Sequence, residues 1–404
     1  MTTDAITSRL REFTSRFFRG HDLRDDEDIF AAGFVNSLFA LQLVQFVEGE
    51  VALRADEFDR AESVPPELIQ KLAARGYLGA VVPEQYGGRG MDAVTLGLLN
   101  EEVGRGCSSV RSLLTVHHMV SLAVLRWGTE AQRRGRLPRL AGGESVAAFA
   151  LTEPNAGSDA RQIETAATRD GDAYILEGEK KWISFGQVAD LFLVFARCEG
   201  GPAAFLVPRD AEGLTVKATG GLLGTRASML AELRLGNCRV PAENLVGREG
   251  FALSHVAASA LDYGRYSVAW GCAGLLRACL EASVRHANAR NQFGSPLKDH
   301  QLIRRMITDM MTDVRAARLL CLRAGQLKDA GDPLAPVETL VAKYFAARAA
   351  MRAASDAVQI HGAVGCSAES SVSRYFRDAK VMEIIEGSNE IQQLAIADYG
   401  HLGL

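Results

Sequence analysis

The sequence of 404 residues lacks the features that mark membrane, secreted and nucleic-acid-binding proteins. No apolar run approaches the roughly 20 residues that a membrane span needs, and the N-terminus lacks the apolar core of a signal peptide. The net charge of −4 provides no basic surface for a nucleic acid. The seven cysteines include no Cys-x-x-Cys pair, and no histidine stands at metal-ligand spacing. We therefore expect a cytoplasmic protein with reduced thiols, no metal site, and no membrane or nucleic-acid partner.

The apolar residues, which make up 48% of the chain, change their spacing twice. Helical spacing runs from about residue 56 to 136 and again from 251 to 399, with long alanine-rich segments at 254–290, 300–329 and 336–360. Between them, a hairpin is expected around Asp170-Gly171, with further strands at 191–196, 203–207 and 231–235. This order predicts an α+β fold with a helical N-terminal domain, a middle β-barrel or β-sandwich domain and a C-terminal four-helix bundle. The expected divisions are a leader at 1–41 and domains at 42–145, 146–248 and 249–404.

Two motifs in the middle segment could hold a flat polar ligand. LTEPNAGSD at 151–159 ends a strand in a glycine-containing turn, whose backbone N–H groups and hydroxyls could hold a hydrogen-bonding ring and a phosphate. KWIS at 181–184 places the indole of Trp182 two residues before the hydroxyl of Ser184. Taken singly, the two have simpler interpretations as an ordinary turn and a core tryptophan.

Four further segments occur with these two in the order found in one enzyme family. The six segments are PEQYGG (83–88), LTEPNAGSD (151–159), KWIS (181–184), VPAENLVG (240–247), RNQFG (290–294) and IEGSNEIQ (385–392). From residue 56 to its C-terminus, the chain resembles the acyl-CoA dehydrogenases. The resemblance implies their fold and an FAD-dependent oxidoreductase.

The resemblance also assigns a cofactor site. Positions that match FAD-contacting residues of the family are Leu151, Thr152, Gly157, Ser158, Trp182, Ser184, Arg290, Phe293, Gln359, Gly362, Ser388 and Glu390. Arg290 and Phe293 match residues that reach the FAD of a neighbouring subunit, which implies a homotetramer or homodimer. From the residues alone, Arg290 would be a solvated helix end.

Glu386 matches the catalytic base of the family, in Glu-Gly-Ser where Glu-Gly-Thr is usual. A carboxylate that is desolvated between flavin and substrate gains basicity where a proton is removed, and the hydride then passes to the flavin. Asp262 and Arg265 match a pair that lines the acyl-pantetheine entrance. The simpler interpretation is that Glu386 is one surface acid among several, beside Glu383 and Glu390.

Three segments look like one branch of the family. CSSVRS (107–112), YGRYSVAWGC (263–272) and YFRDAKVMEIIE (375–386) resemble the dehydrogenases that make hydroxymalonyl thioesters for methoxymalonyl extender units in polyketide biosynthesis. Those enzymes take the acyl group from an acyl carrier protein, so such a protein is the expected partner, together with an electron acceptor for the reduced flavin. Ile385, where tyrosine is usual, and Ser388 depart mildly from the fatty-acid enzymes.

The N-terminal segment DEDIFAAGFVNSLFALQLVQFVE at 26–48 is similar to acyl carrier proteins of the same pathway. In that resemblance Ser37 is the possible phosphopantetheine attachment site, while a serine at a helix start is also a plain N-cap. The last helix of a complete carrier protein is missing, so this leader has little core for an independent domain.

Three hypotheses follow for the function. The first is an FAD-dependent dehydrogenase that oxidises a glycerate-derived unit on a carrier protein toward hydroxymalonyl-ACP, with Glu386 taking either a hydroxyl or an α-proton. The second is a conventional α,β-dehydrogenase of a short acyl-CoA. The third is a flavin-free scaffold protein that keeps only the fold.

Overall fold

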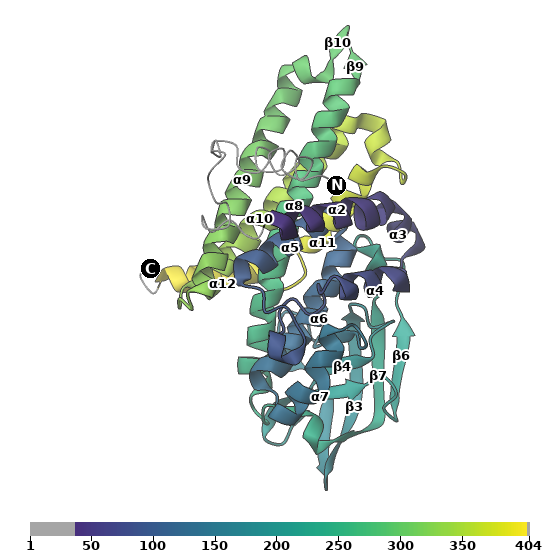
Figure 1. Ribbon diagram of the computed structural model, residues 1–404, viewed down its shortest axis with the longest axis vertical. Coiled ribbons are helices and arrows are strands. Elements are labelled where there is room, and N and C mark those ends of the chain that lie inside the picture. The colour runs from purple at the N-terminus through teal and green to yellow at the C-terminus, as the bar shows by residue number, and fades with distance from the viewer. Residues whose placement is uncertain (1–36, 402–404) are drawn as a thin grey trace.

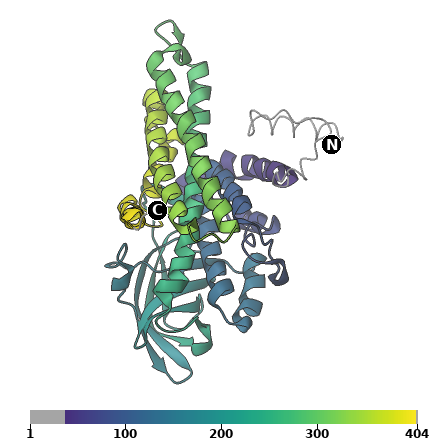
Figure 2. The same ribbon diagram turned by 90° about the vertical axis from the view of Figure 1, so that its left-hand side faces the viewer.

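The computed structural model describes residues 37–401, which form helices, then a sheet, then helices again (Figure 1). The sheet stands at one end of the long axis, and the long C-terminal helices extend to the other end. The turned view shows the N-terminal helices on one side of these long helices, above the sheet (Figure 2). This arrangement confirms the predicted α+β order. Of the helices between Ser37 and His401, none is sufficiently long and apolar to cross a membrane.

The N-terminal helices surround α6 (Ser108–Trp127), in which every residue from Ser108 to Val124 is buried. Side-chain caps define where its neighbours begin, since Asp92 accepts a hydrogen bond from the Thr95 N–H at the start of α5. The other elements of this part are α2 (Ser37–Phe46), η1 (Val47–Val51), η2 (Ala52–Arg54), α3 (Ala55–Ala61), α4 (Pro66–Ala74), η3 (Glu84–Tyr86), α5 (Ala93–Gly106) and α7 (Glu130–Ala141).

Helix α2 runs without a break through the expected boundary between residues 41 and 42. The expected leader otherwise lies outside the described residues, and so does the side chain of Ser37. Carrier-like structure of this leader therefore stays a prediction.

Eight strands form one sheet in the order β6-β7-β3-β2-β4-β5-β8, with β1 paired in parallel to β4. The predicted β2–β3 hairpin turns at Gly171, whose φ of 61° is accessible to glycine without strain. The strand expected just before the 151–159 turn is observed as β1. Two short strands, β6 and β8, were not predicted, because runs this short carry little periodicity. The strands are β1 (Ala147–Ala150), β2 (Ala166–Asp170), β3 (Ala173–Ile183), β4 (Leu191–Cys198), β5 (Gly201–Pro208), β6 (Leu214–Ala218), β7 (Ala231–Pro241) and β8 (Leu245–Val246), with η4 (Ala160–Gln162), η5 (Arg226–Ser228) and η6 (Ala242–Asn244) between them.

The C-terminal part is the predicted helix bundle, in which α8, α9 and α10 pack together and α11 packs on α8 and α10. Buried alanines at helical spacing, such as Ala346, Ala350 and Ala353, allow α10 to approach α8 closely. The elements are η7 (Ala252–Ala257), α8 (Ala258–Ala289), β9 (Asn291–Gln292), β10 (Ser295–Pro296), η8 (Leu297–Asp299), α9 (Gln301–Asp329), α10 (Ala335–His361), η9 (Gly362–Cys366), α11 (Ser371–Met382) and α12 (Asn389–His401).

Helix α8 connects the parts of the molecule. Its 32 residues extend about 48 Å at a rise of 1.5 Å per residue. It packs against α5 and α6 of the N-terminal part and against α9 and α10 of the bundle. Side chains from both helical parts therefore meet on α8, and the candidate site lies on this helix.

Candidate active site

Glu386 lies in the turn between α11 and α12, in a left-handed conformation with φ of 54°. Non-glycine residues rarely adopt this conformation unless surrounding contacts hold them. Here the contacts are made to the backbone, since Lys343 Nζ donates to the Gly387 carbonyl at 2.7 Å. The buried Gln392 amide donates to the carbonyls of Glu386 and Gly387 at 3.2 and 3.1 Å. Two side chains thus fix the turn that carries Glu386.

The carboxylate of Glu386 packs against α8 at Gly264. A Cβ at Gly264 would stand 2.2 Å from Glu386 Oε2, so only glycine accommodates the carboxylate in this position. The same Cβ would lie 3.1 Å from Met119 Sδ of α6. Oε2 is buried and has no hydrogen-bond partner among the described residues. The alternative of a surface acid is therefore wrong for this side chain.

Burial raises the pKa of Glu386, while three cations act in the opposite direction. These are Arg265 of α8, Arg111 of α6 and Lys343 of α10, in decreasing order of effect. Burial also lowers the pKa of Lys343 to about 8. A desolvated carboxylate with an open oxygen can accept a proton from a carbon acid, and the three cations favour its ionised form.

Sequence reasoning identified Glu386 and Arg265 but missed Arg111, Lys343 and Gln392. A usable signal existed for Arg111, because it is the one charged residue of α6 ahead of Arg126 near the helix end. Lys343 likewise interrupts an alanine-rich buried face of α10. Charged residues on apolar faces are rarely buried without a functional or structural partner.

The two middle motifs lie next to each other in the fold. Lys181 N–H donates to the Thr152 carbonyl at 2.9 Å, which brings the 151–159 turn beside Trp182 at the end of β3. Trp182 has a φ of 60° at a register shift of the β3–β7 pair and is 49% exposed. The alternative of a core tryptophan is therefore wrong. Ser184 is half-buried beside it.

A buried ion pair holds the base of this turn. Glu153, within the 151–159 segment, accepts hydrogen bonds from Lys180 Nζ at 2.5 Å, from the Thr165 N–H at 3.0 Å and from the Glu164 N–H. The pKa of Glu153 is lowered because these donors outweigh its burial. Lys180 also donates to the Leu151 carbonyl at 3.3 Å. The turn is thereby anchored to β3, and Gly157 and Ser158 are left exposed at its tip.

These surroundings fit a cofactor with a flat polar ring. An exposed indole stands beside the hydroxyls of Thr152 and Ser184. Near Glu386, the buried atoms Arg265 Nε, Asn389 Oδ1 and Gln392 Oε1 have no hydrogen-bond partner in the described part of the chain. Ring edges and hydroxyls of a flavin would supply partners of this kind.

Four of the remaining predicted cofactor residues lie on the surface, away from the 151–159 turn, and two lie next to Glu386. Arg290 ends α8, and Phe293 is 97% exposed on the β9–β10 hairpin, at the opposite end of the molecule from the sheet (Figure 1). Gln359 and Gly362 are exposed where α10 ends. One chain therefore does not bring these four residues to the 151–159 turn. Ser388 and Glu390 lie at the start of α12, next to Glu386, and a hydrogen bond from Ser388 lowers the pKa of Glu390.

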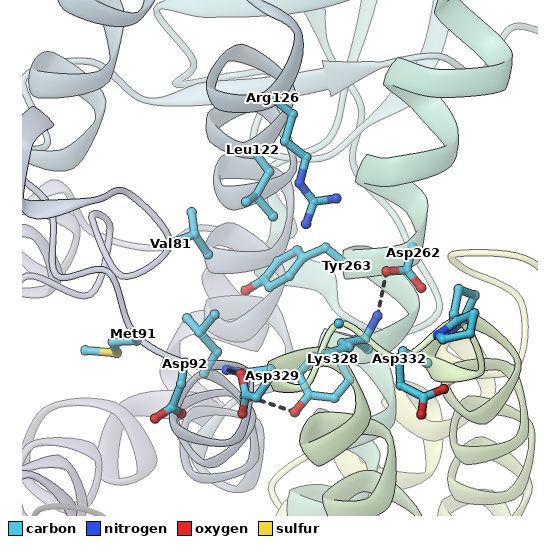
Figure 3. A pocket seen from close by; sticks show the side chains of 17 residues that line it. Val81, Met91, Asp92, Leu122, Arg126, Asp262, Tyr263, Lys328, Asp329 and Asp332 are labelled. Carbon is cyan, nitrogen blue, oxygen red and sulfur yellow. Dashed lines mark hydrogen bonds and ion pairs between the residues drawn. The ribbon is translucent and has the colours of Figure 1, made fainter.

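A cavity of about 450 Å³ opens between α5, α6, α8 and the start of α10 (Figure 3). Its wall includes Leu122, Tyr263 and Asp262, and Asp262 is paired with Lys328 Nζ at 2.5 Å. Asp262 was predicted at an acyl-pantetheine entrance and does line a cavity. Arg265 is not among the residues that line this cavity and instead lies by Gly387.

Models of the acyl-CoA dehydrogenase family match three consecutive parts of the chain. The N-terminal domain matches residues 36–144, the middle domain 148–238 and the C-terminal domain 250–400. The chain therefore belongs to the acyl-CoA dehydrogenase family. The predicted fold, the dehydrogenase class and the FAD cofactor of this family are thereby confirmed.

Curated relatives include short-chain enzymes. An acyl-CoA dehydrogenase of Bacillus subtilis (strain 168) is 39% identical over 360 residues, covering 88% of this chain and 94% of that protein. The mitochondrial short-chain specific acyl-CoA dehydrogenase of Rattus norvegicus is 37% identical over 363 residues, covering 88% and 87%.

Solved structures of similar proteins include a CoA dehydrogenase, an enzyme of polyketide extender-unit biosynthesis and an acyl carrier protein oxidase. Butyryl-CoA dehydrogenase from Megasphaera elsdenii has a TM-score of 0.86 at 34% identity and covers 94% of this chain and 99% of its own. FkbI, for biosynthesis of the methoxymalonyl extender unit of the Fk520 polyketide, has a TM-score of 0.83 at 37% identity and covers 90% of this chain and 99% of its own. The prolyl acyl carrier protein oxidase AnaB has a TM-score of 0.85 at 30% identity and covers 91% of this chain and 98% of its own.

Proposed function

We propose that this chain dehydrogenates a short acyl thioester between Cα and Cβ, with Glu386 as the catalytic base and CoA as the carrier. The observation that carries the proposal is the buried Oε2 of Glu386, which has no partner in the described residues and whose pKa is raised. Short-chain and butyryl enzymes among the relatives support a short acyl group on CoA.

In this reaction Oε2 of Glu386 takes the α-proton, the β-carbon loses a hydride, and a Cα–Cβ double bond forms. FAD, when bound, accepts that hydride. Gly264 and the left-handed turn at Glu386 hold the carboxylate in one position. A fixed position favours transfer of the α-proton to Oε2. Lys343 positions the turn by its bond to the Gly387 carbonyl. The reduced cofactor then requires an external electron acceptor.

The cofactor would be held by two sets of residues. Within one chain, these are Leu151, Thr152, Gly157, Ser158, Trp182, Ser184, Ser388 and Glu390. Arg290, Phe293, Gln359 and Gly362 would reach the FAD of a second copy, since they are exposed and the hairpin stands far from the sheet (Figure 1). We therefore propose a homodimer or homotetramer.

The test is the loss of oxidised-flavin absorbance when the anaerobic holoenzyme is mixed with butyryl-CoA. We expect bleaching in the wild type and much less in Glu386→Gln. Full activity of the Gln variant would refute the assignment of the base. A colourless purified protein would favour the flavin-free scaffold instead.

A second candidate is hydride transfer to the same cofactor from a glycerate-derived unit on a carrier protein, as one step toward hydroxymalonyl-ACP, with Glu386 taking either a hydroxyl proton or an α-proton. It is favoured by the similarity to FkbI and to a prolyl acyl carrier protein oxidase. Faster bleaching by glyceryl-ACP than by butyryl-CoA would select this candidate. The possible role of Ser37 has its own test, because a phosphopantetheinyl transferase would increase the intact mass of the chain only if the serine is an attachment site.

A further inference from the structure

Arg111 is a buried cation with no ion-pair partner within 4.0 Å among residues 37–401. It lies in α6 and is 1% exposed. Its guanidinium donates from Nη1 to Thr115 Oγ1 at 2.8 Å and to Ser267 Oγ at 3.5 Å, and from Nη2 to Met382 Sδ at 3.6 Å. Its Nε has no partner within residues 37–401. One good hydrogen bond and two long ones leave donors unused, because a guanidinium carries five N–H groups.

Carboxylates nearby do not compensate this charge. Asp378 influences the pKa of Arg111 only at a distance, since its Oδ1 accepts the Thr225 N–H at 2.6 Å and its Oδ2 lies 3.9 Å from Arg374. Glu386 also acts on Arg111 electrostatically, but no ion pair between them falls within 4.0 Å in the described chain. A buried charge without a close partner costs several kcal/mol, so its retention calls for a ligand.

Hydroxyl and amide groups continue from Arg111 along α8 and α5. Thr115 Oγ1 and Ser267 Oγ share a hydrogen bond of 2.6 Å, and Ser267 donates to Asn100 Oδ1 at 2.6 Å. All of these side chains are at least nine-tenths buried. An interior that binds only an alkyl chain gains nothing from such groups, because each polar atom must be desolvated.

Arg111 lies on the Glu386 side of α8. Its Cδ and Nε would be 2.4 and 2.8 Å from a Cβ at Gly271, and its Nη1 reaches Ser267, one turn from the Gly264 that supports Glu386. Two further cations, Arg265 and Lys343, act on the same carboxylate. The buried charges therefore have an excess of positive sign beside the reacting position.

We propose that Arg111, with Thr115 and Ser267, forms a subsite for an oxygen-bearing end of the acyl group, a carboxylate or a hydroxyl, in place of an alkyl end. The inference rests on the proposed function, because it specifies the acyl group that Glu386 deprotonates. A site built to hydrogen-bond an oxygen rejects an alkyl analogue strongly, since the analogue leaves its donors unpaired.

Two pairs of thioesters of matched shape test this subsite on the holoenzyme. Succinyl is compared with 4-methylpentanoyl, and 4-hydroxybutyryl with pentanoyl, each on CoA and on an acyl carrier protein. We expect kcat/KM to favour the oxygen-bearing member by about 100-fold or more in at least one pair. The succinyl pair reports a carboxylate subsite and the hydroxybutyryl pair a hydroxyl subsite.

Variants at Arg111 separate recognition from folding. Arg111→Met removes the charge and is expected to abolish the preference, Arg111→Lys to retain part of it for succinyl, and Thr115→Val to weaken it. Binding is measured in parallel on Glu386→Gln, where flavin spectral changes report the dissociation constants without turnover. If Arg111→Met does not fold, the preference of the wild type and its change in Arg111→Lys and Thr115→Val still test the subsite.

The outcomes separate this inference from the proposed function. Preference of the wild type for the alkyl member in both pairs would overturn the subsite, while leaving the enzyme an acyl thioester dehydrogenase. An unchanged preference in Arg111→Met would also overturn it. If no thioester is oxidised, the proposed function fails, and equal dissociation constants within each pair on Glu386→Gln would then reject the subsite separately.

Discussion

Two buried glutamates of this protein have opposite surroundings. Glu153 in the middle domain accepts hydrogen bonds from one lysine and two backbone N–H groups, and its pKa is lowered. Glu386 has an oxygen without a partner in the described residues, although three cations lie near, and its pKa is raised. The same side chain is a saturated acceptor in one place and has an open acceptor oxygen in the other.

The difference shows how environment separates structural from reactive carboxylates. At Glu153 the acceptor sites are occupied, so no proton from a ligand has a place there. At Glu386 the nearest side-chain bonds go to the backbone of the turn and not to the carboxylate, which stays available. Replacing each glutamate by glutamine should therefore affect different properties.

The largest expected effect is on the rate in Glu386→Gln. The amide cannot accept the α-proton, so the rate of flavin reduction should fall by about 10³-fold. Thermal unfolding of the variant should be unchanged or shifted upward, because the burial of this carboxylate outweighs the effect of the three cations near it. Stopped-flow bleaching and differential scanning calorimetry measure the two properties. A large loss of stability would assign Glu386 a structural role.

The matched change Glu153→Gln should mainly reduce stability. It leaves the buried Lys180 without its counter-charge, which we expect to cost about 3 to 5 kcal/mol in the free energy of unfolding. Denaturant titration measures this difference. A double variant, Glu153→Leu with Lys180→Met, should recover part of it, since no charge then remains unpaired. An unchanged free energy of unfolding in Glu153→Gln would show that Glu153 does not have the structural role that distinguishes it from Glu386.

A smaller effect on rate is expected from Gly264→Ala. Its Cβ would stand 2.2 Å from Glu386 Oε2, so the carboxylate must move away from the α-carbon. Misplacement of about 1 Å can reduce the rate by about 10²-fold. The control is Gly135→Ala in α7, where a Cβ meets no atom within 4 Å. Equal rates in the two variants would show that the carboxylate is not held against α8.

The pH dependence of flavin reduction should shift in Arg265→Gln. The base must be ionised, so the rate falls as the pH drops through the pKa of Glu386. Arg265 lowers that pKa, and its removal should move the acid limb of the profile to higher pH. Arg111→Met should shift it in the same direction by less. A limb that stays in place would show that these cations do not act on the base.

The smallest effect is expected in the acid unfolding of Glu153→Gln. The pKa of Glu153 is lower in the folded than in the unfolded protein. Its contribution to stability is therefore present above the pKa of the unfolded protein and is lost as the pH falls through the pKa of the folded protein. The difference in unfolding free energy between wild type and variant should therefore narrow below about pH 4.5. Unfolding measured at a series of acidic pH values provides the test.

Much of the fold was predictable from the sequence, because long segments with clear periodicity form its main elements. The expected helix at 300–329 is observed as α9, and the Asp170-Gly171 hairpin joins β2 and β3. The short strands β6 and β8 were missed, since two to five residues do not define a period. Packing against neighbouring strands, and not local preference, stabilises them.

The sequence by itself determined the α+β order, the family motifs and the identity of Glu386, because these depend on residue types in a fixed local order. Only the tertiary structure decided what surrounds Glu386. Its cations come from α6, α8 and α10, which are far apart in the chain and meet only on packing. Desolvation and unpaired polar atoms are properties of that packed interior, so the open oxygen of Glu386 and the unused donors of Arg111 could be recognised only there.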